Sequence, residues 1–340
     1  MGLQRLDIAA FLPKTDALPV LDVRSPGEFA QGHIPGAVSF PLFTDDERAK
    51  VGTRYKQIGK DSAFILGLEF VGPKMAGFVK QALKLAPDKR IAVHCWRGGQ
   101  RSGSMAWLLQ GAGFEVATLI GGYKTYRQWV LEYFTAPQLD IRVVGGPTGT
   151  GKTKIIHALR ALGEQVIDLE ALAHHKGSAF GFIGEQPQPT VEQFENDLHH
   201  ALGTIDPGRR VWVENESRSI GRVFIPDGFW KNMKAAPLLH INIPYEARMD
   251  NLLADYVLED TENLQLAFDK IATKLGGLRH KNALESLQNG DFRSAAAIAL
   301  EYYDKTYQHC LDNNISPDIR VRNFDSGDPT EIARALIAEQ

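Results

Sequence analysis

The segment GGPTGTGKT, residues 145–153, indicates the fold of the second half of the chain. It fits the pattern G-x-x-x-x-G-K-[ST], with an apolar strand expected before it at 139–144 and a helix expected from its lysine onward. In that context the loop amides cradle a diphosphate, the lysine contacts the phosphates and the last hydroxyl is available to Mg²⁺. The residues we expect to bind the diphosphate are Gly146, Thr148, Gly149, Gly151, Lys152 and Thr153.

Acidic residues follow two further expected strands, at 165–169 and 210–214. Asp168 ends the first, and Glu214 and Glu216 end the second. They are candidates for a carboxylate linked to the metal or to the phosphates, and the alternative of simple charges at strand ends stays open. Mg²⁺ is a candidate ion, no metal site is firm, and no tightly bound cofactor is expected. A loop of this kind binds any diphosphate ester, so the pattern does not establish nucleotide hydrolysis.

A second anion loop is expected upstream, in HCWRGGQRSGS at 94–104. Cys95 ends an expected strand and precedes a helix. Gly98 and Gly99 allow the backbone to curl so that successive amides face one anion, and the helix N-terminus adds partial positive charge. With Arg97 and Arg101 nearby, these features favour a thiolate and indicate a catalytic nucleophile. The alternative is a buried structural cysteine, which needs neither the glycines nor the arginines.

Strands alternate with helices around both loops, which predicts an α/β fold with parallel sheets covered on both faces. The 340 residues suffice for two domains. We expect a first domain at 12–134, a linker at 135–140 and a second domain at 141–340. The boundary is expected in Thr135-Ala-Pro-Gln138, and the chain looks mostly helical from about residue 245, with a weak strand near 318–322.

Composition excludes a globally basic coat, because 38 Lys and Arg face 41 Asp and Glu, a net charge of −3. A nucleic-acid partner would therefore meet local basic patches. Two cysteines far apart predict no disulfide framework and a reducing compartment. We expect a cytoplasmic protein without a signal peptide or a membrane partner, since no apolar run approaches the roughly 18 residues that span a bilayer.

The first half of the chain resembles rhodanese-type sulfurtransferases. DVRSPGEFAQGHIPGAVSFP (22–41) is similar to their first signature and GGYKTYRQW (121–129) to their second. The resemblance implies that Cys95 carries a persulfide or a heavier chalcogen, and that Asp22 and Arg24 brace the loop. The spacing from Cys95 to Arg101 is one residue longer than in the common rhodanese loop. That longer loop also resembles cysteine phosphatases and accommodates a larger anion.

A rhodanese-like domain followed by a P-loop domain resembles the bacterial tRNA 2-selenouridine synthases. The similarity extends to the following segments: VGTRYKQIGKDSA (51–63), IDLEALAHHKGSAFG (167–181), VENESRSIG (213–221) and IPYEARM (243–249). It implies replacement of sulfur by selenium from selenophosphate in wobble 2-thiouridine of tRNA, by way of S-geranylation with geranyl diphosphate. Cys95 would then be the selenium-carrying cysteine (S-selanylcysteine). The implied partners are tRNA and an enzyme that supplies selenophosphate.

Basic residues for tRNA contact are expected in two places. The segment 46–60 includes Arg54 and Lys56, and the aromatic helix at 123–134 includes Lys124 and Arg127. Backbone binding needs such localised charge, although an ordinary solvated surface has the same composition. Two other functions stay open: a rhodanese-type sulfurtransferase or cysteine phosphatase with an appended nucleotide-binding domain, and a small-molecule kinase whose rhodanese-like domain only binds a partner.

Overall fold

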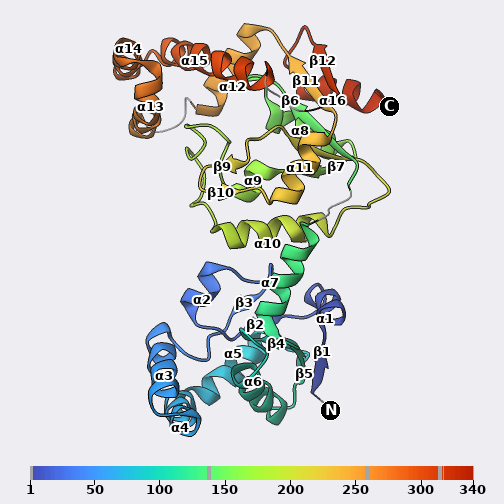
Figure 1. Cartoon of the computed structure of the whole chain (residues 1–340), viewed down its shortest axis with the longest axis vertical. Coiled ribbons are helices and arrows are strands. Elements are labelled where there is room, and N and C mark those ends of the chain that lie inside the picture. The colour runs from blue at the N-terminus through green and yellow to red at the C-terminus, as the bar shows by residue number, and fades with distance from the viewer. Residues whose placement is uncertain (1–2, 136–138, 257–260, 313–315, 317, 340) are drawn as a thin grey trace. The chain divides into compact units, whose positions relative to one another are not determined.

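The computed structural model describes residues 3–135, 139–256, 261–312, 316 and 318–339. The chain divides into two compact units, Met1–Tyr133 and Phe134–Gln340. Most of the boundary segment expected at 135–138 lies outside the described residues. Each unit contains a five-stranded parallel sheet with helices packed on it, which confirms the predicted α/β class (Figure 1).

The first sheet has the strand order β1-β5-β4-β2-β3, with every neighbouring pair parallel. Its strands are β1 (Gln4–Leu6), β2 (Val20–Asp22), β3 (Val38–Ser39), β4 (Arg90–His94) and β5 (Glu115–Leu119). The short edge strand β1 precedes residue 12 and pairs with β5. Strand β4 is central, and its apolar residues Ile91, Ala92 and Val93 are fully buried. The loop that follows β4 therefore starts from the middle of the sheet.

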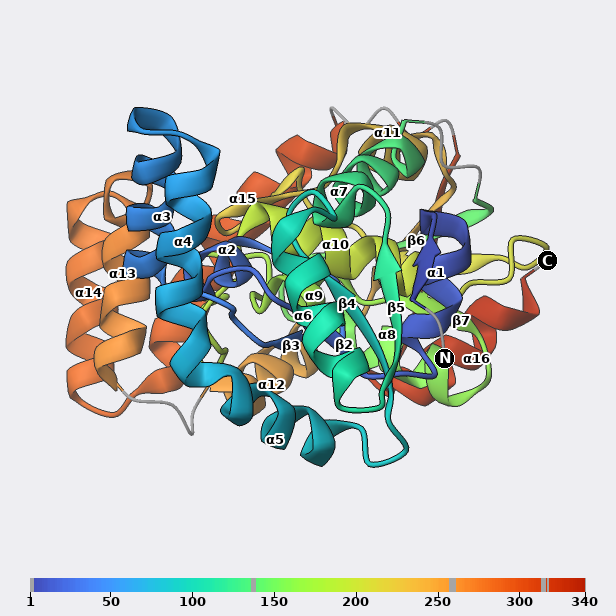
Figure 2. The same ribbon diagram turned by 90° about the horizontal axis from the view of Figure 1, so that it is seen from below.

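The helices of the first unit surround this sheet. They are α1 (Ile8–Thr15), α2 (Pro26–Gln31), α3 (Asp45–Gln57), α4 (Lys60–Val71), α5 (Met75–Leu85), α6 (Gln100–Gly111) and α7 (Gly122–Tyr133). Helices α3 and α4 pack side by side as a hairpin (Figure 2). The segment from Lys60 to Leu85 is helical almost throughout, with a 3₁₀ turn at Gly72–Lys74 joining α4 to α5.

Among the described residues, one helical segment, Lys60–Leu85, is long and apolar enough to cross a membrane by length and composition alone, and little of it is buried. Its exposed apolar side chains include Phe64, Ile65 and Leu68 of α4. The apolar-run criterion missed this segment because Lys, Asp and Glu interrupt the run. The expected cytoplasmic location without a membrane partner stays a prediction.

The second sheet has the order β12-β11-β6-β8-β7 and is also parallel throughout. Its strands are β6 (Ile141–Gly145), β7 (Gln165–Ile167), β8 (Val211–Glu214), β11 (Leu238–Asn242) and β12 (Ile319–Asn323). Strand β12 is the weak strand expected near 318–322. A small antiparallel pair, β9 (Ser219–Ile220) and β10 (Val223–Phe224), was not predicted because two-residue strands leave no alternating pattern.

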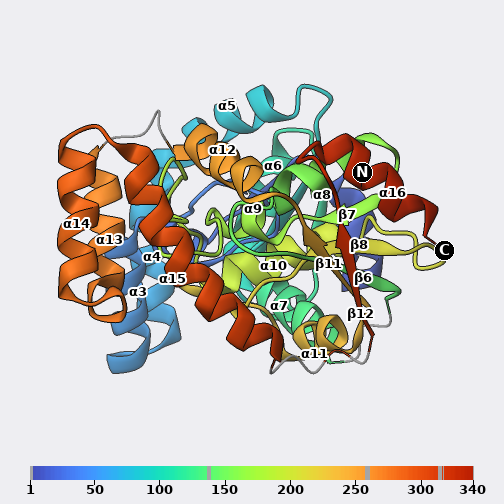
Figure 3. The same cartoon turned by 90° about the horizontal axis from the view of Figure 1, so that it is seen from above.

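The second unit has a sheet layer and a separate helical part. Its helices are α8 (Lys152–Ala161), α9 (Leu169–Ala173), α10 (Val191–Leu202), α11 (Asp227–Ala235), α12 (Tyr245–Tyr256), α13 (Thr261–Leu275), α14 (Gly277–Gln288), α15 (Phe292–Asp312) and α16 (Pro329–Ala338). Helices α13 and α14 pack with the first part of α15 away from the sheet, whereas Tyr307 near the other end of α15 contacts His240 of β11 at 3.0 Å (Figure 3). Their apolar core includes Phe268 and Leu287 and is distinct from the sheet core around Val144 and Ile155.

Candidate functional site

The first candidate site is the loop at the carboxyl end of β4. Cys95 directly follows β4 and is 3% exposed, and its Sγ lies 3.2 Å from the Ser102 hydroxyl. Ser102 belongs to α6, which begins at Gln100, so the loop runs into a helix N-terminus with its partial positive charge. The arrangement places one buried sulfur beside a helix N-terminus, and its role as a nucleophile in an anion-binding loop stays a prediction. Sequence reasoning missed Ser102, although it lies within the quoted motif.

The loop is fastened to the turn that starts α7. The Tyr123 amide donates to the Cys95 carbonyl at 2.8 Å, and the Lys124 amide donates to the Trp96 carbonyl at 2.9 Å. At Gly122, whose φ is +63°, any Cβ would collide with the Cys95 carbonyl oxygen. Only glycine permits this close approach. The GGY motif therefore supports the cysteine loop directly.

A buried ion pair lies beside the loop. Arg24 Nε and Nη2 donate to Asp22 at 2.9 and 2.6 Å, and Nη2 also donates to the Gly32 carbonyl at 2.6 Å. The Arg24 guanidinium lies 3.8 Å from the centroid of the Tyr123 ring, a cation–π contact. Both charged side chains are almost fully buried. The pair connects the end of β2 to the helix that anchors the Cys95 loop.

Arg101 is held by an acid that sequence reasoning missed. Its Nη1 donates to Glu28 at 2.6 Å, and Arg48 forms a second ion pair with Glu28 at 2.9 Å. Burial alone would raise the pKa of Glu28, but the hydrogen bond and charge of Arg101, the Ser25 amide and the charge of Arg48 lower it to about 2. Arg101, expected to bind an anion, is thus bound to α2, while the Arg97 side chain is exposed.

The basic residues expected to contact tRNA fall in different places. Lys56 lines a cavity of about 600 Å³ between α3 and α4, together with Arg101 and Phe64. Arg54 lies on the same helix as Lys56, outside that lining. Lys124 and Arg127 lie on α7, and the Lys124 backbone contacts the Cys95 loop. The structure therefore brings Lys56 and Lys124 close to elements of the cysteine loop and leaves the tRNA role of all four as a prediction.

The second candidate site is the P-loop between β6 and α8, which lines a cavity of about 1010 Å³. Within the loop, Lys152 Nζ donates to the Gly146 carbonyl at 3.3 Å. The loop starts from the central strand, at the point where the strand order turns from one side of β6 to the other, which is where open α/β sheets bind ligands. The predicted loop residues lie along this cavity: Gly146, Thr148, Gly149, Gly151, Lys152 and Thr153.

Helix α12 holds the P-loop in shape. Arg248 Nε donates to the Thr148 carbonyl at 2.9 Å, and Asn251 Nδ2 donates to the Gly149 carbonyl at 3.0 Å. A Cβ at Gly149, where φ is +83°, would lie 2.7 Å from the Arg248 carbonyl oxygen. Arg248 also pairs with Asp304 of α15. Sequence reasoning assigned neither Arg248 nor Asn251 a role, although IPYEARM was among the quoted motifs.

Four carboxyl groups gather on the sheet side of the P-loop. The Thr153 hydroxyl donates to Glu170 at 2.6 Å, so Glu170, which was not predicted, holds the P-loop hydroxyl. Asp168 caps α9 by accepting from the Ala171 amide at 2.8 Å and lies 2.7 Å from His157 Nε2. Glu216 lines the cavity, whereas Glu214 is fully buried and neither of its oxygens has a hydrogen-bond partner.

Burial raises the pKa of three of these groups, and mutual repulsion adds to the effect. The pKa of Glu216 rises to about 8 and that of Glu214 well above its ordinary value, in each case through burial and then the charge of Glu170. Burial also raises the pKa of Glu170, opposed by its hydrogen bond from Thr153. Acidic groups with pKa values shifted in this way are frequent at functional sites.

The donor set beside the P-loop suits Mg²⁺. The described residues hold no group of three or more His, Cys, Asp or Glu side chains placed to bind a metal ion. Mg²⁺ needs fewer protein ligands, because it usually takes one or two carboxylates and completes its shell with water and substrate phosphates. Thr153 and Glu170 provide hard oxygen donors at the cavity wall.

Comparisons with known proteins agree with this arrangement. The family profile described as "tRNA 2-selenouridine synthase AAA domain" matches residues 139–336, and the rhodanese-like domain profile matches residues 7–128. A protein of Bdellovibrio bacteriovorus named tRNA 2-selenouridine synthase is 39% identical, over 81% of this chain and 80% of its own length. Proteins of the same name from Nitrosomonas europaea and Chromohalobacter salexigens are 35% and 34% identical, covering 85% and 91% of this chain and 88% and 92% of their own.

Removing the buried guanidinium should destabilise the first unit strongly. Arg24→Met leaves the Asp22 carboxylate buried without its partner, which costs on the order of 3–5 kcal/mol. Hydrogen exchange followed by mass spectrometry should show faster exchange in β2 and β4. Arg90→Met, at an exposed position of β4, is the matched control. Equal exchange in the two variants would contradict a supporting role for the ion pair.

Because of Glu28, the free energy of unfolding should vary with pH in the acid range. Its pKa is lowered from 4.5 to about 2 in the folded chain, so its contribution is complete above pH 4.5 and is lost as the pH falls toward 2. We expect Glu28→Gln to cost about 1–3 kcal/mol at neutral pH, after allowing for solvent screening, and much less near pH 2. Thermal unfolding across pH measures this, with the exposed Glu69→Gln as control. A constant difference at all pH values would be the contrary result.

Proposed function

This chain belongs to the tRNA 2-selenouridine synthase family, and on that basis we propose that it replaces the sulfur of wobble 2-thiouridine in tRNA with selenium from selenophosphate. We propose further that the reaction passes through S-geranylation of the thiouridine by geranyl diphosphate. The family named by the comparisons is a tRNA-modifying class, rather than the phosphatase, sulfurtransferase or kinase classes that the sequence had left open.

The observation that carries the proposal is the presence of two different anion loops, each at the carboxyl end of the central strand of its own sheet. One contains a buried cysteine next to a helix N-terminus. The other is a P-loop with a lysine and a hydroxyl–carboxylate pair. Two anionic substrates, selenophosphate and a prenyl diphosphate, correspond to these two loops.

In the first step, the P-loop would hold the diphosphate of the prenyl donor. The thiouridine sulfur forms a bond to C1 of the geranyl group, the bond from that carbon to the diphosphate oxygen breaks, and N3 of the base loses its proton. Lys152 and the loop amides stabilise the negative charge that gathers on the leaving diphosphate. Mg²⁺, held by Thr153 and Glu170, would add positive charge at the same oxygens.

In the second step, selenium would replace the alkylated sulfur. Selenophosphate and water together supply hydrogen selenide and phosphate. The selenide bonds to C2, the bond from C2 to sulfur breaks, geranylthiol leaves and N3 regains a proton. No oxidant or reductant is required. Alkylation helps because a thiol leaves far more readily than a thiocarbonyl sulfur. We assign the release of selenium to Cys95, which precedes the α6 N-terminus: its thiolate would accept the phosphoryl group as the phosphorus–selenium bond breaks, and water would then hydrolyse the phosphocysteine to phosphate and the free thiol.

Lys152→Ala should reduce geranyl transfer. Loss of one charge-assisted contact to a diphosphate corresponds to about a 10- to 100-fold lower rate. Mass analysis of nucleosides from thiolated tRNA incubated with geranyl diphosphate measures the product. Arg160→Ala, at the exposed other end of α8, serves as the control and should retain the parent rate. Normal geranylation by Lys152→Ala would contradict the role of the P-loop in geranyl transfer.

Cys95→Ala should separate the two steps. Without the thiolate, S-geranylated tRNA is expected to accumulate while 2-selenouridine falls below detection, because the first step does not use this residue. The same nucleoside analysis, now with selenophosphate included, reports both products. Cys310→Ser, at the other cysteine of the chain, is the control. Formation of 2-selenouridine by Cys95→Ala would overturn the assignment.

A further inference from the structure

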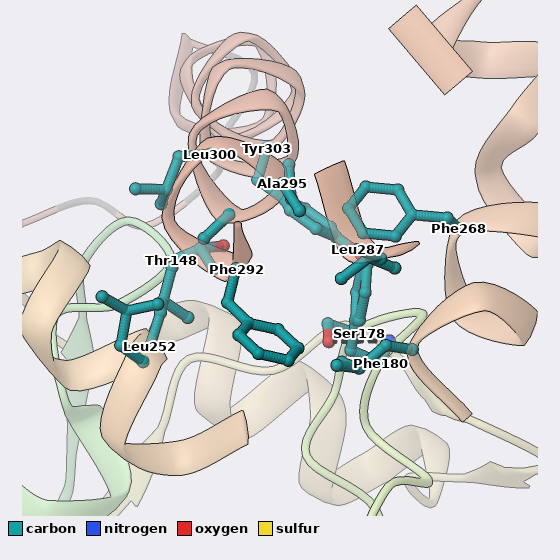
Figure 4. A pocket seen from close by; sticks show the side chains of 14 residues that line it. Thr148, Ser178, Phe180, Leu252, Phe268, Leu287, Phe292, Ala295, Leu300 and Tyr303 are labelled. Carbon is teal, nitrogen blue, oxygen red and sulfur yellow. Dashed lines mark hydrogen bonds between the residues drawn. The ribbon is translucent and has the colours of Figure 1, made fainter. Parts of the chain in front are cut away.

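A narrow apolar cavity of about 70 Å³ adjoins the P-loop and is not used by either step described above. It lies among helices α12, α13, α14 and α15 and the segment at 178–180 (Figure 4). Figure 4 shows Thr148, Leu252 and Phe292 on one side and Phe180, Phe268 and Leu287 on the other. None of the described residues that line it is charged.

This cavity is continuous in its lining with the larger P-loop cavity. Four residues line both: Thr148, Ser178, Leu252 and Tyr303. Thr148 belongs to the P-loop itself, and its carbonyl is held by Arg248. A molecule whose diphosphate lies on the loop can therefore pass over this shared rim and place an apolar end among the helices.

Two hydroxyl groups at the rim form hydrogen bonds within the protein. The Tyr303 hydroxyl accepts a hydrogen bond from the Ala179 amide at 3.1 Å, and the Ser178 hydroxyl accepts from the Phe180 amide at 3.2 Å. Burial raises the pKa of Tyr303 to about 12, so this hydroxyl stays neutral. The first contact fastens the 178–180 segment to α15, the second lies within that segment, and the lining beyond the rim is apolar.

An apolar lining selects one class of diphosphate ester. A nucleoside base placed there would bury donors and acceptors without partners, and each such group is costly. A branched hydrocarbon loses no hydrogen bonds and gains from leaving water. The chemistry therefore favours a diphosphate whose organic part is hydrocarbon.

We propose that this cavity, lined by Leu252, Phe268, Leu287, Phe292 and Ala296, receives the hydrocarbon tail of the diphosphate bound by the P-loop. The inference rests on the proposed function, because it takes the P-loop ligand to be a prenyl diphosphate. An engineered cavity of about 150 Å³ accommodates benzene, so about 70 Å³ holds a group of about half that size, such as the branched end of the chain with its two terminal methyl groups. The unit next to the diphosphate then lies over the shared rim.

Small residues of α15 create the room for this tail. Ala295, Ala296 and Ala299 all line the cavity, and Ala296 is half-buried, so its substitution does not require repacking of the deep core. A phenylalanine at this position would fill the space. Ala297, also half-buried and next along α15, is not part of the lining and offers a matched control.

The experiment measures binding to the full-length chain by calorimetry, in Mg²⁺, with inorganic diphosphate, dimethylallyl diphosphate, geranyl diphosphate and ADP as probes. The parent should bind geranyl diphosphate at least about tenfold more tightly than inorganic diphosphate, since several buried methylene equivalents contribute. Ala296→Phe should remove most of that preference without changing the affinity for inorganic diphosphate. Ala297→Phe should keep it. A second variant, Phe292→Ala, should shift the preference severalfold toward farnesyl diphosphate.

Several results would overturn the inference. Lys152→Ala should weaken binding of both geranyl diphosphate and inorganic diphosphate. If it does, but Ala296→Phe and Phe292→Ala leave the affinity ratios between the diphosphates unchanged, the hydrocarbon tail lies elsewhere. The proposed function would survive that result. Equal losses in Ala296→Phe and Ala297→Phe would also count against the cavity. If no diphosphate binding depends on Lys152, or if ADP binds more tightly than geranyl diphosphate, both the inference and the prenyl step fail.

Discussion

Both candidate sites depend on one constraint: backbone groups must converge at the carboxyl end of a central parallel strand. In the first unit, Gly122 approaches the Cys95 carbonyl so closely that no Cβ fits, and two backbone hydrogen bonds from the start of α7 fix the loop. In the second, Gly149 packs against the Arg248 backbone while α12 holds two P-loop carbonyls. Because the carbonyls are held from outside, the loop amides are left available to bind an anion.

The sequence predicted the strands that end in these loops, because short apolar runs followed by glycine-rich motifs have few other interpretations. It also predicted the P-loop residues, whose spacing is specific. It did not predict the side chains that arrive from distant segments. Glu28 meets Arg101, and Glu170 meets Thr153, only after the sheets have formed. The local sequence around Glu28 or Glu170 does not predict which residue each will contact. The same is true of Asn251, which contacts the P-loop.

The carboxyl cluster shows how the second site departs from the most stable arrangement. Glu214 is fully buried with neither oxygen hydrogen-bonded, and burial together with Glu170 raises its pKa well above the usual range. Such a group costs stability, since a buried polar group without a partner is unfavourable. The cost is concentrated behind the P-loop, where Thr153 and Glu170 face the cavity. By contrast, several hydrogen bonds hold the Asp22–Arg24 pair of the first unit, which lies beside its loop.

We propose that alkylation at the P-loop precedes selenium transfer at Cys95, with S-geranylated tRNA as the compound that links them. The most direct test supplies purified S-geranylated tRNA and selenophosphate, without geranyl diphosphate, to the Lys152→Ala variant and counts selenouridine by mass analysis. We expect Lys152→Ala to form 2-selenouridine and geranylthiol at close to the parent rate, and Cys95→Ala to form neither product. Absence of selenouridine with Lys152→Ala, in a variant that still binds the tRNA, would contradict the proposal.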